Sequence, residues 1–359
     1  MTRRILFFAF GLLLSAHAVA AAAPDEGVPH YDHILVIIAE NQSYRPMMSG
    51  ETTPNLKRLA ETYGVASNFF AEVHPSEGNY VAMLGGSNFG IHDDDAFYCR
   101  KGSTDRYCGN AAEPDYPDHT IRARSLVDQL DAHHLSWKGY FQDIPKLGST
   151  AVRAPDPAAL KPDEIPAIYA VKHNGFMNFA RVQKDPRRAG KIVGFDQLAR
   201  DLASGHVPAF AHIVPNQCDD MHGIEAPSAP EDCQKSNEPG RRARGDAAIS
   251  KLVERIQHSP IWSKPGNTAI VITFDEDGKP RDPAEPQACC GSPAEAGGHI
   301  VTIVITNHGP RGVVDPTPYN HYSLLRTTED AFGIAEHLNH AGDTASGVVP
   351  MTPLFAVAR

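Results

Sequence analysis

Residues 33–39 (HILVIIA) form a run in which almost every side chain is apolar. A strand with one face in water alternates apolar and polar side chains, whereas a strand covered on both faces by helices is apolar along most of its length. The run therefore predicts a buried strand of a parallel sheet, which places the chain in the α/β class.

Further apolar runs alternate with amphipathic segments along the rest of the chain, as a helix-covered sheet requires. Strands are predicted at residues 65–72, 138–141, 207–214, 268–274 and 299–306. Helices are predicted at residues 54–63, 78–84, 125–134, 246–256 and 322–332, with Ser125 and Asp246 as N-caps. We expect a mostly parallel central sheet flanked by helices, in one domain over residues 24–359.

Three long insertions, rich in Pro, Gly and charged residues, interrupt this pattern at residues 93–118, 215–241 and 278–298. Loops of this length in a compact domain are either functional or disordered. We expect them to shape the rim of a site. Together they contain all six cysteines, for which we predict the local pairs Cys99–Cys108 and Cys218–Cys233. Cys289 and Cys290 are adjacent, and disulfide geometry argues against a bond between them.

The amino terminus reads as a signal peptide. Arg3 and Arg4 precede a short apolar stretch, and Ala18-Val19-Ala20 fits a cleavage site after residue 20, with residue 23 as an alternative. The stretch is shorter than the roughly 20 apolar residues of a membrane span. We expect an exported protein, periplasmic or secreted, with no stable membrane span.

The formal net charge of −10 and the absence of a Lys/Arg run argue against nucleic acid as a partner. A net-negative protein also repels phosphate esters at long range. If the chain binds such esters, a local cation must reverse the sign of the field, and a metal ion is the simplest source.

Polar side chains follow five of the predicted strands. They are Glu40-Asn41 after the first, His74 to Asn79 after the second, Asn216 to His222 after the strand near residue 210, Asp275-Glu276-Asp277 after residue 274, and Asn307-His308 after residue 306. In parallel sheets, ligands bind beyond the carboxyl ends of the strands. We therefore expect one shared site at this edge of the sheet.

Oxygen donors dominate two of these strand ends. Glu40, Asn41, Asp275 and Glu276 are the candidate metal ligands, and such ligands suit Mg²⁺, Ca²⁺ or Mn²⁺. Zn²⁺ would also fit if an imidazole such as His299 or His321 joined them. The sequence does not choose between these ions.

Ser76 is the candidate nucleophile, because it lies between a strand and a helix start, where free N–H groups favour phosphate. A serine hydroxyl needs a base or a metal to activate it. His74 lies two residues away and would assist or orient it. The competing interpretation is that Ser76 is an ordinary N-cap.

His222 and His321 are the candidates for proton donation to a leaving alcohol. His222 follows two aspartates within three residues, and His321 opens the last predicted helix. Lys172-His173 is a further basic pair, which either contacts phosphate oxygens or belongs to a solvated loop.

Six segments resemble, in the same order, a family of bacterial phosphoesterases that includes secreted acid phosphatases and phosphatidylcholine-type phospholipases C. They are VIIAENQSY, TPNLKRLA, EVHPSEGNY, IVPNQCDDMHG, FDEDG and YNHYSLLRTTEDAFGI, and they span most of the chain. The resemblance implies an alkaline-phosphatase-like fold and a divalent metal ion.

By the same resemblance, Glu40, Asn41, Asp275 and Glu276 would bind metal and Ser76 would be phosphorylated. Asn79 would hold a phosphate oxygen, His74, His173 and Asp220 would contact substrate, and His222 and His321 would be catalytic. Asp219 stands where the family usually has Asn, and Gly78 replaces a common Pro. The cysteine-bearing insertions have no obvious counterpart.

We therefore expect an acid phosphatase that hydrolyses phosphate monoesters through a phosphoserine. Its substrate would be a small phosphate ester or the headgroup of a phosphoinositide or phospholipid. The alternatives are a phospholipase C acting on phosphodiesters and a phosphate- or metal-binding protein without turnover. The chain lacks an obvious apolar lipid-docking stripe, which favours the monoesterase.

Overall fold

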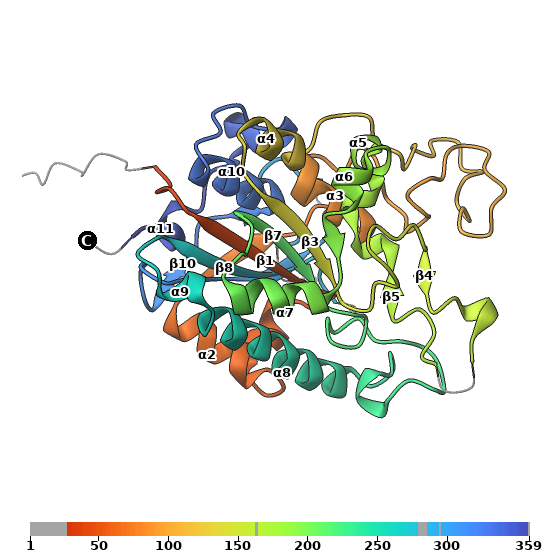
Figure 1. The fold of residues 1–359 in the computed structure, drawn as a ribbon, viewed down its shortest axis with the longest axis horizontal. Coiled ribbons are helices and arrows are strands. Elements are labelled where there is room, and N and C mark those ends of the chain that lie inside the picture. Colours follow the sequence, from red (N-terminus) through yellow and green to blue (C-terminus); the bar gives the residue numbers. More distant parts are fainter. Residues whose placement is uncertain (1–26, 162–163, 279–285, 294–295, 358–359) are drawn as a thin grey trace, which may run out of the picture.

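The computed structural model describes residues 27–161, 164–278, 286–293 and 296–357. Its centre is one sheet with the strand order β10-β2-β9-β8-β1-β7-β3-β6, and β11 pairs with β2 off this path (Figure 1). The strands are β1 (His33–Ala39), β2 (Gly64–Phe70), β3 (Trp137–Phe141), β6 (Ile192–Val193), β7 (Phe210–Val214), β8 (Thr268–Phe274), β9 (His299–Thr306), β10 (Val313–Asp315) and β11 (Tyr319–Asn320).

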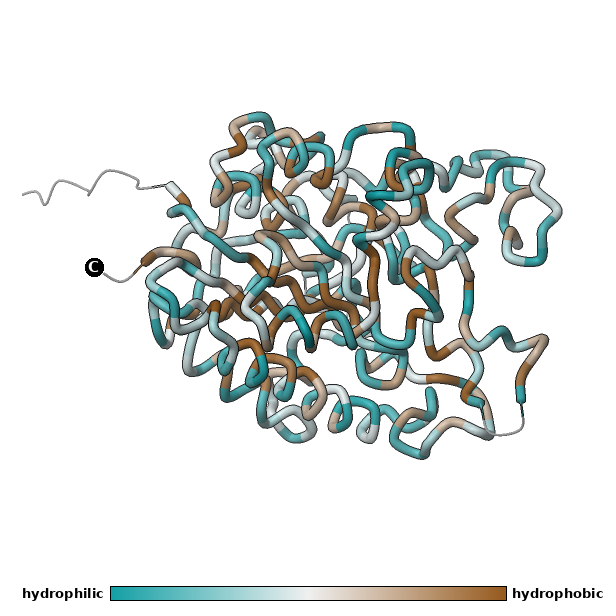
Figure 2. The backbone as a smooth tube through the Cα atoms, viewed as in Figure 1, coloured by the Kyte–Doolittle hydropathy of each residue, from teal (hydrophilic) through white to brown (hydrophobic). Residues whose placement is uncertain are grey.

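The apolar run of residues 33–39 is strand β1, as predicted, and it lies between β7 and β8. Both of its neighbours run parallel to it, with Ile34 opposite Phe210 on one side and Ala269 on the other. All seven residues of β8 are buried as well. Figure 2 shows these strands as the most hydrophobic part of the chain. Burying such strands on both faces is the main apolar contribution to folding.

Helices cover both faces of the sheet (Figure 1). The helices are α1 (Tyr44–Ser49), α2 (Pro54–Thr62), α3 (Glu77–Gly85), α4 (Leu126–Ala132), α5 (Ala180–Gln183), α6 (Pro186–Ala189), α7 (Phe195–Ser204), α8 (Glu238–Gln257), α9 (Pro260–Ser263), α10 (His321–Ala331) and α11 (Thr352–Phe355). α2, α7, α8 and α9 lie on one face, and α3, α4 and α10 lie on the other.

One strand runs against the expected direction. β9 is antiparallel to both of its neighbours, β8 and β2. Its carboxyl end therefore lies at the opposite edge of the sheet, where Asn307 Oδ1 accepts a hydrogen bond from the backbone N–H of Thr268, the first residue of β8. The prediction that Asn307 and His308 join the other strand ends was wrong. The start of β9, at His299, lies at the shared edge instead.

Asp246 was predicted to begin a helix, but α8 begins eight residues earlier, and the side chain of Asn237 accepts the N–H of Gly240 there. Asp246 does cap a helix, but a different one. Its carboxylate accepts the N–H groups of Asn55 (3.1 Å) and Leu56 (2.8 Å) at the start of α2. A periodicity argument cannot find this contact, because the two residues are far apart in sequence.

Both local cysteine pairs form disulfides, Cys99–Cys108 and Cys218–Cys233, as predicted. The adjacent Cys289 and Cys290 are also bonded to each other, which corrects the expectation that they would not bridge. The reason is local, because Cys290 adopts a left-handed conformation (φ 56°) in the turn that the pair spans.

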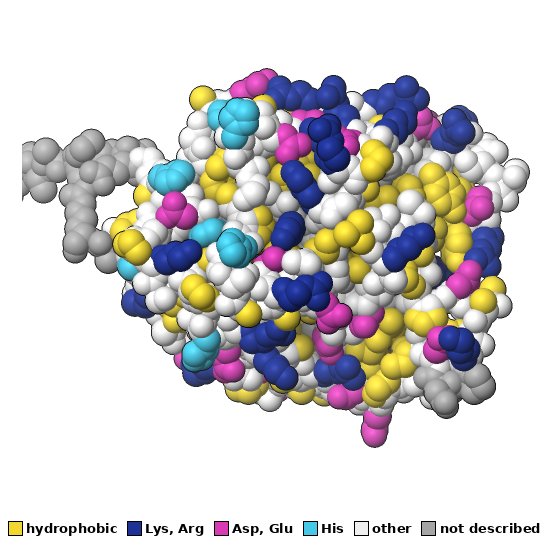
Figure 3. Space-filling view, in the orientation of Figure 1, with side chains coloured by type: hydrophobic (Ala, Val, Ile, Leu, Met, Phe, Trp, Pro, Cys, Tyr) yellow, Lys and Arg dark blue, Asp and Glu magenta, His cyan; other side chains and the backbone are white. Residues whose placement is uncertain are grey.

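Outside the main sheet, β4 (Arg153–Ala154) and β5 (Tyr169–Ala170) form a small antiparallel pair. In the described part of the chain, no helix combines the length and apolar character that crossing a bilayer requires. The predicted signal peptide at residues 1–20 lies outside the described residues. On the face seen in Figure 3, basic and acidic side chains are interspersed.

Candidate active site

The ends of β1, β2, β7 and β8 meet at one edge of the sheet, and their following residues are tied together through the backbone. The N–H of Glu40 donates to the carbonyl of Asp220 (2.8 Å), and the N–H of Asp275 donates to the carbonyl of Ala39 (3.0 Å). The N–H of Asn41 donates to Asp275 Oδ1 (2.9 Å). Glu40, Asp220 and Asp275 are all fully buried. The parallel arrangement predicted from the apolar runs therefore places three carboxylates in one small volume.

Ser76 lies immediately before α3 but does not cap it, since its side chain makes no capping hydrogen bond. Its hydroxyl instead donates to Glu40 Oε2 at 3.2 Å and also interacts with Asp275. The N-cap interpretation of Ser76 is thus not what the structure shows. The hydroxyl points at the carboxylates, with the N-terminus of a nine-residue helix behind it.

Tyr80 and His173 complete the surroundings of Glu40. The phenol of Tyr80 donates to Glu40 Oε1 at 2.5 Å. His173 Nε2 lies 3.3 Å from Glu40 Oε2, and His173 Nδ1 lies 3.5 Å from Asp220 Oδ2. The imidazole stacks on the Tyr80 ring, with 5.4 Å between the ring centroids. Burial first, and then the positive charge of Lys172, lower the pKa of His173 well below its usual range, so the ring is neutral.

The three carboxylates repel one another. Burial, followed by the charges of Asp275 and Asp220, raises the pKa of Glu40 well above its usual range. Burial and the charge of Glu276 raise the pKa of Asp275 to about 8. Three side-chain oxygens in this volume, Asn41 Oδ1, Asp220 Oδ2 and Asp275 Oδ2, are buried without a hydrogen-bond partner among the described residues. Buried polar atoms of native proteins are normally satisfied.

A divalent cation fits this set of oxygens. It would satisfy the three orphaned acceptors and neutralise part of the charge that raises the two pKa values. The geometry bears on two predicted roles. Asp220, expected to contact substrate, lies with the candidate metal ligands. Glu276, expected to bind metal, instead forms an ion pair with His74 Nδ1.

His222 and Lys172 lie on the open side of the carboxylates. His222 Nδ1 donates to the carbonyl of Gly223 (2.7 Å), which leaves Nε2 as an acceptor, 3.4 Å from Lys172 Nζ. Glu40, His173 and His222 each offer one atom to a group in which all atoms lie within 4.8 Å of one another. With its proton on Nδ1, the neutral ring presents Nε2 as an acceptor, and the role of His222 as a proton donor stays a prediction.

His321 is fully buried behind the site, and its Nε2 donates to the carbonyl of Phe274 at 2.9 Å. Its backbone N–H donates to Glu72 Oε1 (3.0 Å). Burial lowers the pKa of His321 to about 4. The ring therefore holds the backbone that carries Asp275, and its role as a proton donor to a leaving group stays a prediction.

The polar atoms of the Asn79 side chain also form hydrogen bonds with backbone groups of the protein. Its Oδ1 accepts the N–H groups of Glu72 (2.9 Å) and Val73 (3.2 Å), and its Nδ2 donates to the Val73 carbonyl (2.7 Å). The side chain fixes the turn between β2 and Ser76, and a phosphate contact would cost these bonds. His74 is likewise engaged, with Nε2 3.0 Å from Asp277 Oδ1.

Sequence reasoning missed Tyr80 and Asp94, and it named Asp277 at its strand end without giving it a role. Asp94 Oδ2 lies 2.8 Å from Lys172 Nζ and holds the ammonium in place. Tyr80 lies four residues after Ser76, so both face the same side of α3. That spacing could have identified Tyr80 from the sequence. Asp94 comes from a loop, where no periodic spacing points to it.

Solved structures with a similar fold define the class. The chain superposes on a protein of the alkaline phosphatase superfamily from Vibrio parahaemolyticus with a TM-score of 0.53 and 12% identity, over 86% of this chain and 68% of that one. It superposes on Ps i-CgsB, solved with a neocarrahexaose, with a TM-score of 0.52 and 15% identity, over 91% and 76% of the two chains. The fold is therefore that of the alkaline-phosphatase-like α/β proteins.

Within that class, the chain belongs to the Phosphoesterase family, whose model matches residues 46–335. It is 24% identical to a phosphatidylinositol-3-phosphatase of Mycobacterium tuberculosis, over 86% of this chain and 79% of that protein. It is also 24% identical to a phosphate-repressible acid phosphatase of Penicillium chrysogenum, over 85% of this chain but only 60% of that longer protein. The predicted family and enzyme class, a phosphoric ester hydrolase, are confirmed.

Proposed function

We propose that this chain is an exported, metal-dependent acid phosphatase that hydrolyses phosphate monoesters through a phosphoserine at Ser76. The observation that carries the proposal is the direction of the Ser76 hydroxyl. It is not used as a helix cap and donates to Glu40 among three buried carboxylates. A serine held there has no evident structural duty.

Glu40, Asn41, Asp220 and Asp275 would hold the divalent cation, since three of their oxygens are buried without partners. When bound, the cation would lower the pKa of the serine hydroxyl and offset the negative charge of the phosphoryl group. The identity of the ion stays open between Mg²⁺, Ca²⁺, Mn²⁺ and Zn²⁺, because His173 and His222 offer nitrogen donors beside the oxygens.

The chain's own residues account for the two displacements. The Ser76 hydroxyl passes its proton to Glu40 Oε2, to which it donates, and Oγ forms a bond to phosphorus while the bond between phosphorus and the alcohol oxygen breaks. The N-terminus of α3 and the ammonium of Lys172 face the phosphoryl oxygens and stabilise their charge. The alcohol leaves on the side of Lys172 and His222 and takes its proton from water there. The oxygen of a water molecule then forms a bond to phosphorus, the bond between phosphorus and Ser76 Oγ breaks, and Oγ takes back the proton from Glu40 as phosphate leaves.

The relatives support a monoester substrate, since both are described as phosphatases. A phospholipase C would act on a diester with the same nucleophile, and a binding protein would retain phosphate without turnover. Export is supported by the amino-terminal sequence and by three disulfides in the described chain, which persist in oxidising compartments.

The test is turnover of a chromogenic phosphate monoester by the Ser76→Ala protein. We expect its rate to fall by at least about 10³-fold, while calorimetry still detects binding of the divalent ion. Ser204→Ala, an exposed serine at the end of α7, is the matched control and should keep full activity. Near-normal turnover by Ser76→Ala would exclude Ser76 as the nucleophile.

Two further outcomes decide between the alternatives. Release of phosphocholine from phosphatidylcholine, faster than release of phosphate from a monoester, would favour the phospholipase C. Tight retention of phosphate with no hydrolysis under any divalent ion would favour the binding protein.

A further inference from the structure

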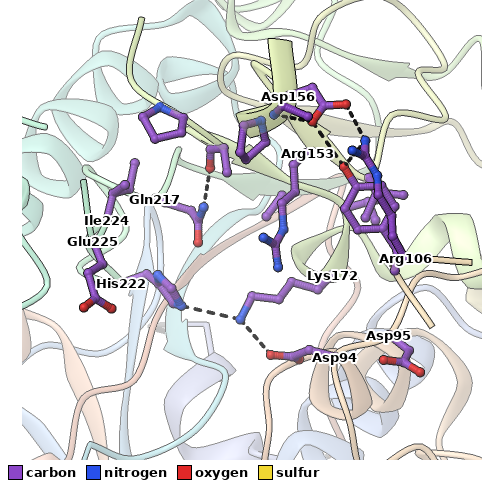
Figure 4. A pocket seen from close by; sticks show the side chains of 18 of the residues that line it. Asp94, Asp95, Arg106, Arg153, Asp156, Lys172, Gln217, His222, Ile224 and Glu225 are labelled. Carbon is purple, nitrogen blue, oxygen red and sulfur yellow. Dashed lines mark hydrogen bonds and ion pairs between the residues drawn. The ribbon is translucent and has the colours of Figure 1, made fainter. Parts of the chain in front are cut away.

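A groove of about 730 Å³ opens beside the candidate active site. It begins at Lys172 and His222 and runs outward between the two loops that the local disulfides close. One wall carries Arg106 and Tyr107, the other carries Ile224 and Lys235. Figure 4 shows Arg153, from β4, extending into the cavity toward Lys172 and His222.

The cations of this groove differ in whether they are already paired. Lys172 is bound to Asp94 (2.8 Å), and Arg106 forms hydrogen bonds with Asp156. Arg153 and Lys235 are exposed and form no ion pair within the described ranges of the chain. Both therefore remain available to an anion.

Three of the four carboxylates that line the groove are engaged by groups other than these two cations. Asp94 and Asp156 are used by Lys172 and Arg106. Asp95 is buried and accepts hydrogen bonds from the N–H of Gly109 (3.0 Å) and the hydroxyl of Tyr116 (2.8 Å). Glu225 is the remaining carboxylate of the lining, so the groove holds as many carboxylates as cations, and Arg153 and Lys235 are the cations without an ion pair among its described residues.

The charge of Lys235 acts on the catalytic side of the groove. Burial first, and then the charges of Lys172 and Lys235, lower the pKa of His222 well below its usual range. Arg153 is held near the wall, because its guanidinium carbon lies 5.9 Å from the centroid of the Tyr107 ring. Its backbone pairs with Ala170, two residues before Lys172.

We propose that Arg153 and Lys235 form a subsite for a second anionic group, so that the preferred substrates are phosphate monoesters whose alcohol carries another phosphate. This inference rests on the proposed function, which puts the scissile phosphoryl group at Ser76. The leaving alcohol then extends into the groove, where the two unpaired cations lie. Both charges act on a group that is not itself cleaved, and they contribute to binding.

Two kinds of molecule carry this chemistry, namely soluble sugar bisphosphates and membrane phosphoinositides. The shared feature is a monoester and a second phosphate on one polyol. The groove lies between polar loops, so it requires no membrane, and we expect soluble compounds to show the preference.

The experiment compares kcat/KM for fructose 1,6-bisphosphate and fructose 6-phosphate at low salt, corrected for the number of esters. We expect wild type to prefer the bisphosphate by about tenfold, and the preference to shrink as salt screens the charges. The Arg153→Gln/Lys235→Gln protein should lose the preference. Lys251→Gln, an exposed lysine of α8 outside the groove, should retain it.

A wild-type preference near one, or a preference that survives the double substitution, would overturn the subsite. A preference seen only with phosphatidylinositol 3-phosphate in phosphatidylcholine vesicles, and not with soluble inositol 1,3-bisphosphate, would also overturn it, since a membrane contact would then explain the effect.

Binding to the Ser76→Ala protein, measured by calorimetry, separates this inference from the proposed function. Tighter binding of the bisphosphate without turnover by wild type would overturn the phosphatase and leave the subsite standing. Turnover of both the bisphosphate and the monophosphate by wild type, with equal binding of the two to Ser76→Ala, would overturn the subsite and leave the phosphatase standing.

Discussion

Ser76 and Tyr80 donate to opposite oxygens of one carboxylate, that of Glu40, at 3.2 Å and 2.5 Å. They lie one turn apart on the same side of α3, so the helix fixes the nucleophile and the orientation of Glu40 together. Glu40 in turn follows the central strand β1, whose neighbours hold it rigidly. The reactive group is thus positioned by two elements that pack in the core.

Replacing Tyr80 with Phe should therefore impair catalysis. The substitution removes one hydrogen bond to a buried carboxylate, worth roughly 1.5–3 kcal/mol, so we expect kcat/KM for a chromogenic monoester to fall by about tenfold or more. Tyr140→Phe is the matched control, since Tyr140 donates to Asp201 at 2.6 Å away from the site. It should lower stability but not the activity of folded protein. Equal activity losses in both variants would contradict this account.

Removing the divalent ion should destabilise the protein. The carboxylates of Glu40, Asp220 and Asp275 repel one another without a cation, and an ion at 100 times its Kd adds about 2.7 kcal/mol to the free energy of unfolding. We expect chelation to lower Tm and re-addition of the ion to restore it. Asp275→Asn should raise Tm in chelator and abolish the increase caused by the ion. An ion-dependent increase that survives in Asp275→Asn would rule out this ligand.

His212 should make the protein less stable at acid pH. Burial lowers its pKa from 6.5 to about 3, so between these values the unfolded chain binds a proton that the folded chain does not. Stability from this residue is therefore complete above about pH 6.5 and declines, by at most about 1.4 kcal/mol per pH unit, as pH falls toward 3.

His212→Phe tests that sign. Whatever the cost of repacking the core, the free energy of unfolding, measured with urea at several pH values, should depend less on pH in the variant. His308→Phe, an exposed histidine, is the control and should keep the wild-type slope. Equal slopes in all three proteins would show that His212 does not titrate as described.

The disulfides should differ in how much they contribute to the free energy of unfolding. Cys218–Cys233 closes a loop of 15 residues, for which the unfolded-state entropy model gives roughly 3 kcal/mol. Cys289–Cys290 closes almost no loop, since its separation is one residue. The Cys218→Ser/Cys233→Ser protein should therefore lose far more stability in urea than Cys289→Ser/Cys290→Ser. The first variant should also lose activity, because Asp220 and His222 lie inside that loop. A reversed order of stabilities would refute the argument.

Asp246→Ala should cost about 1–2 kcal/mol of stability without changing the activity of folded protein, because it caps α2 from a distance. Glu254→Ala on the same helix, α8, serves as the control. A change of less than about 0.3 kcal/mol in Asp246→Ala would show that other groups satisfy the two N–H groups.

The site was only partly predictable, for reasons that differ between residues. Glu40 directly follows an apolar run and Ser76 lies in the short segment between a strand and a helix, so local order sufficed to find them. His321 and Asn79 match the family pattern, yet their hydrogen bonds go to Phe274, Glu72 and Val73. A motif gives the identity of a side chain but not the direction in which it points.

By itself, the sequence determined the α/β class, the central strand β1, the family and the set of polar residues at the strand ends, because these depend on local patterns of apolar and polar side chains. Only the tertiary structure decided that β9 runs antiparallel, that Asp220 lies with Glu40 and Asp275, and that the groove keeps Arg153 and Lys235 unpaired. Each of these depends on which distant segments meet, and a contact between distant segments leaves no periodic trace in the chain.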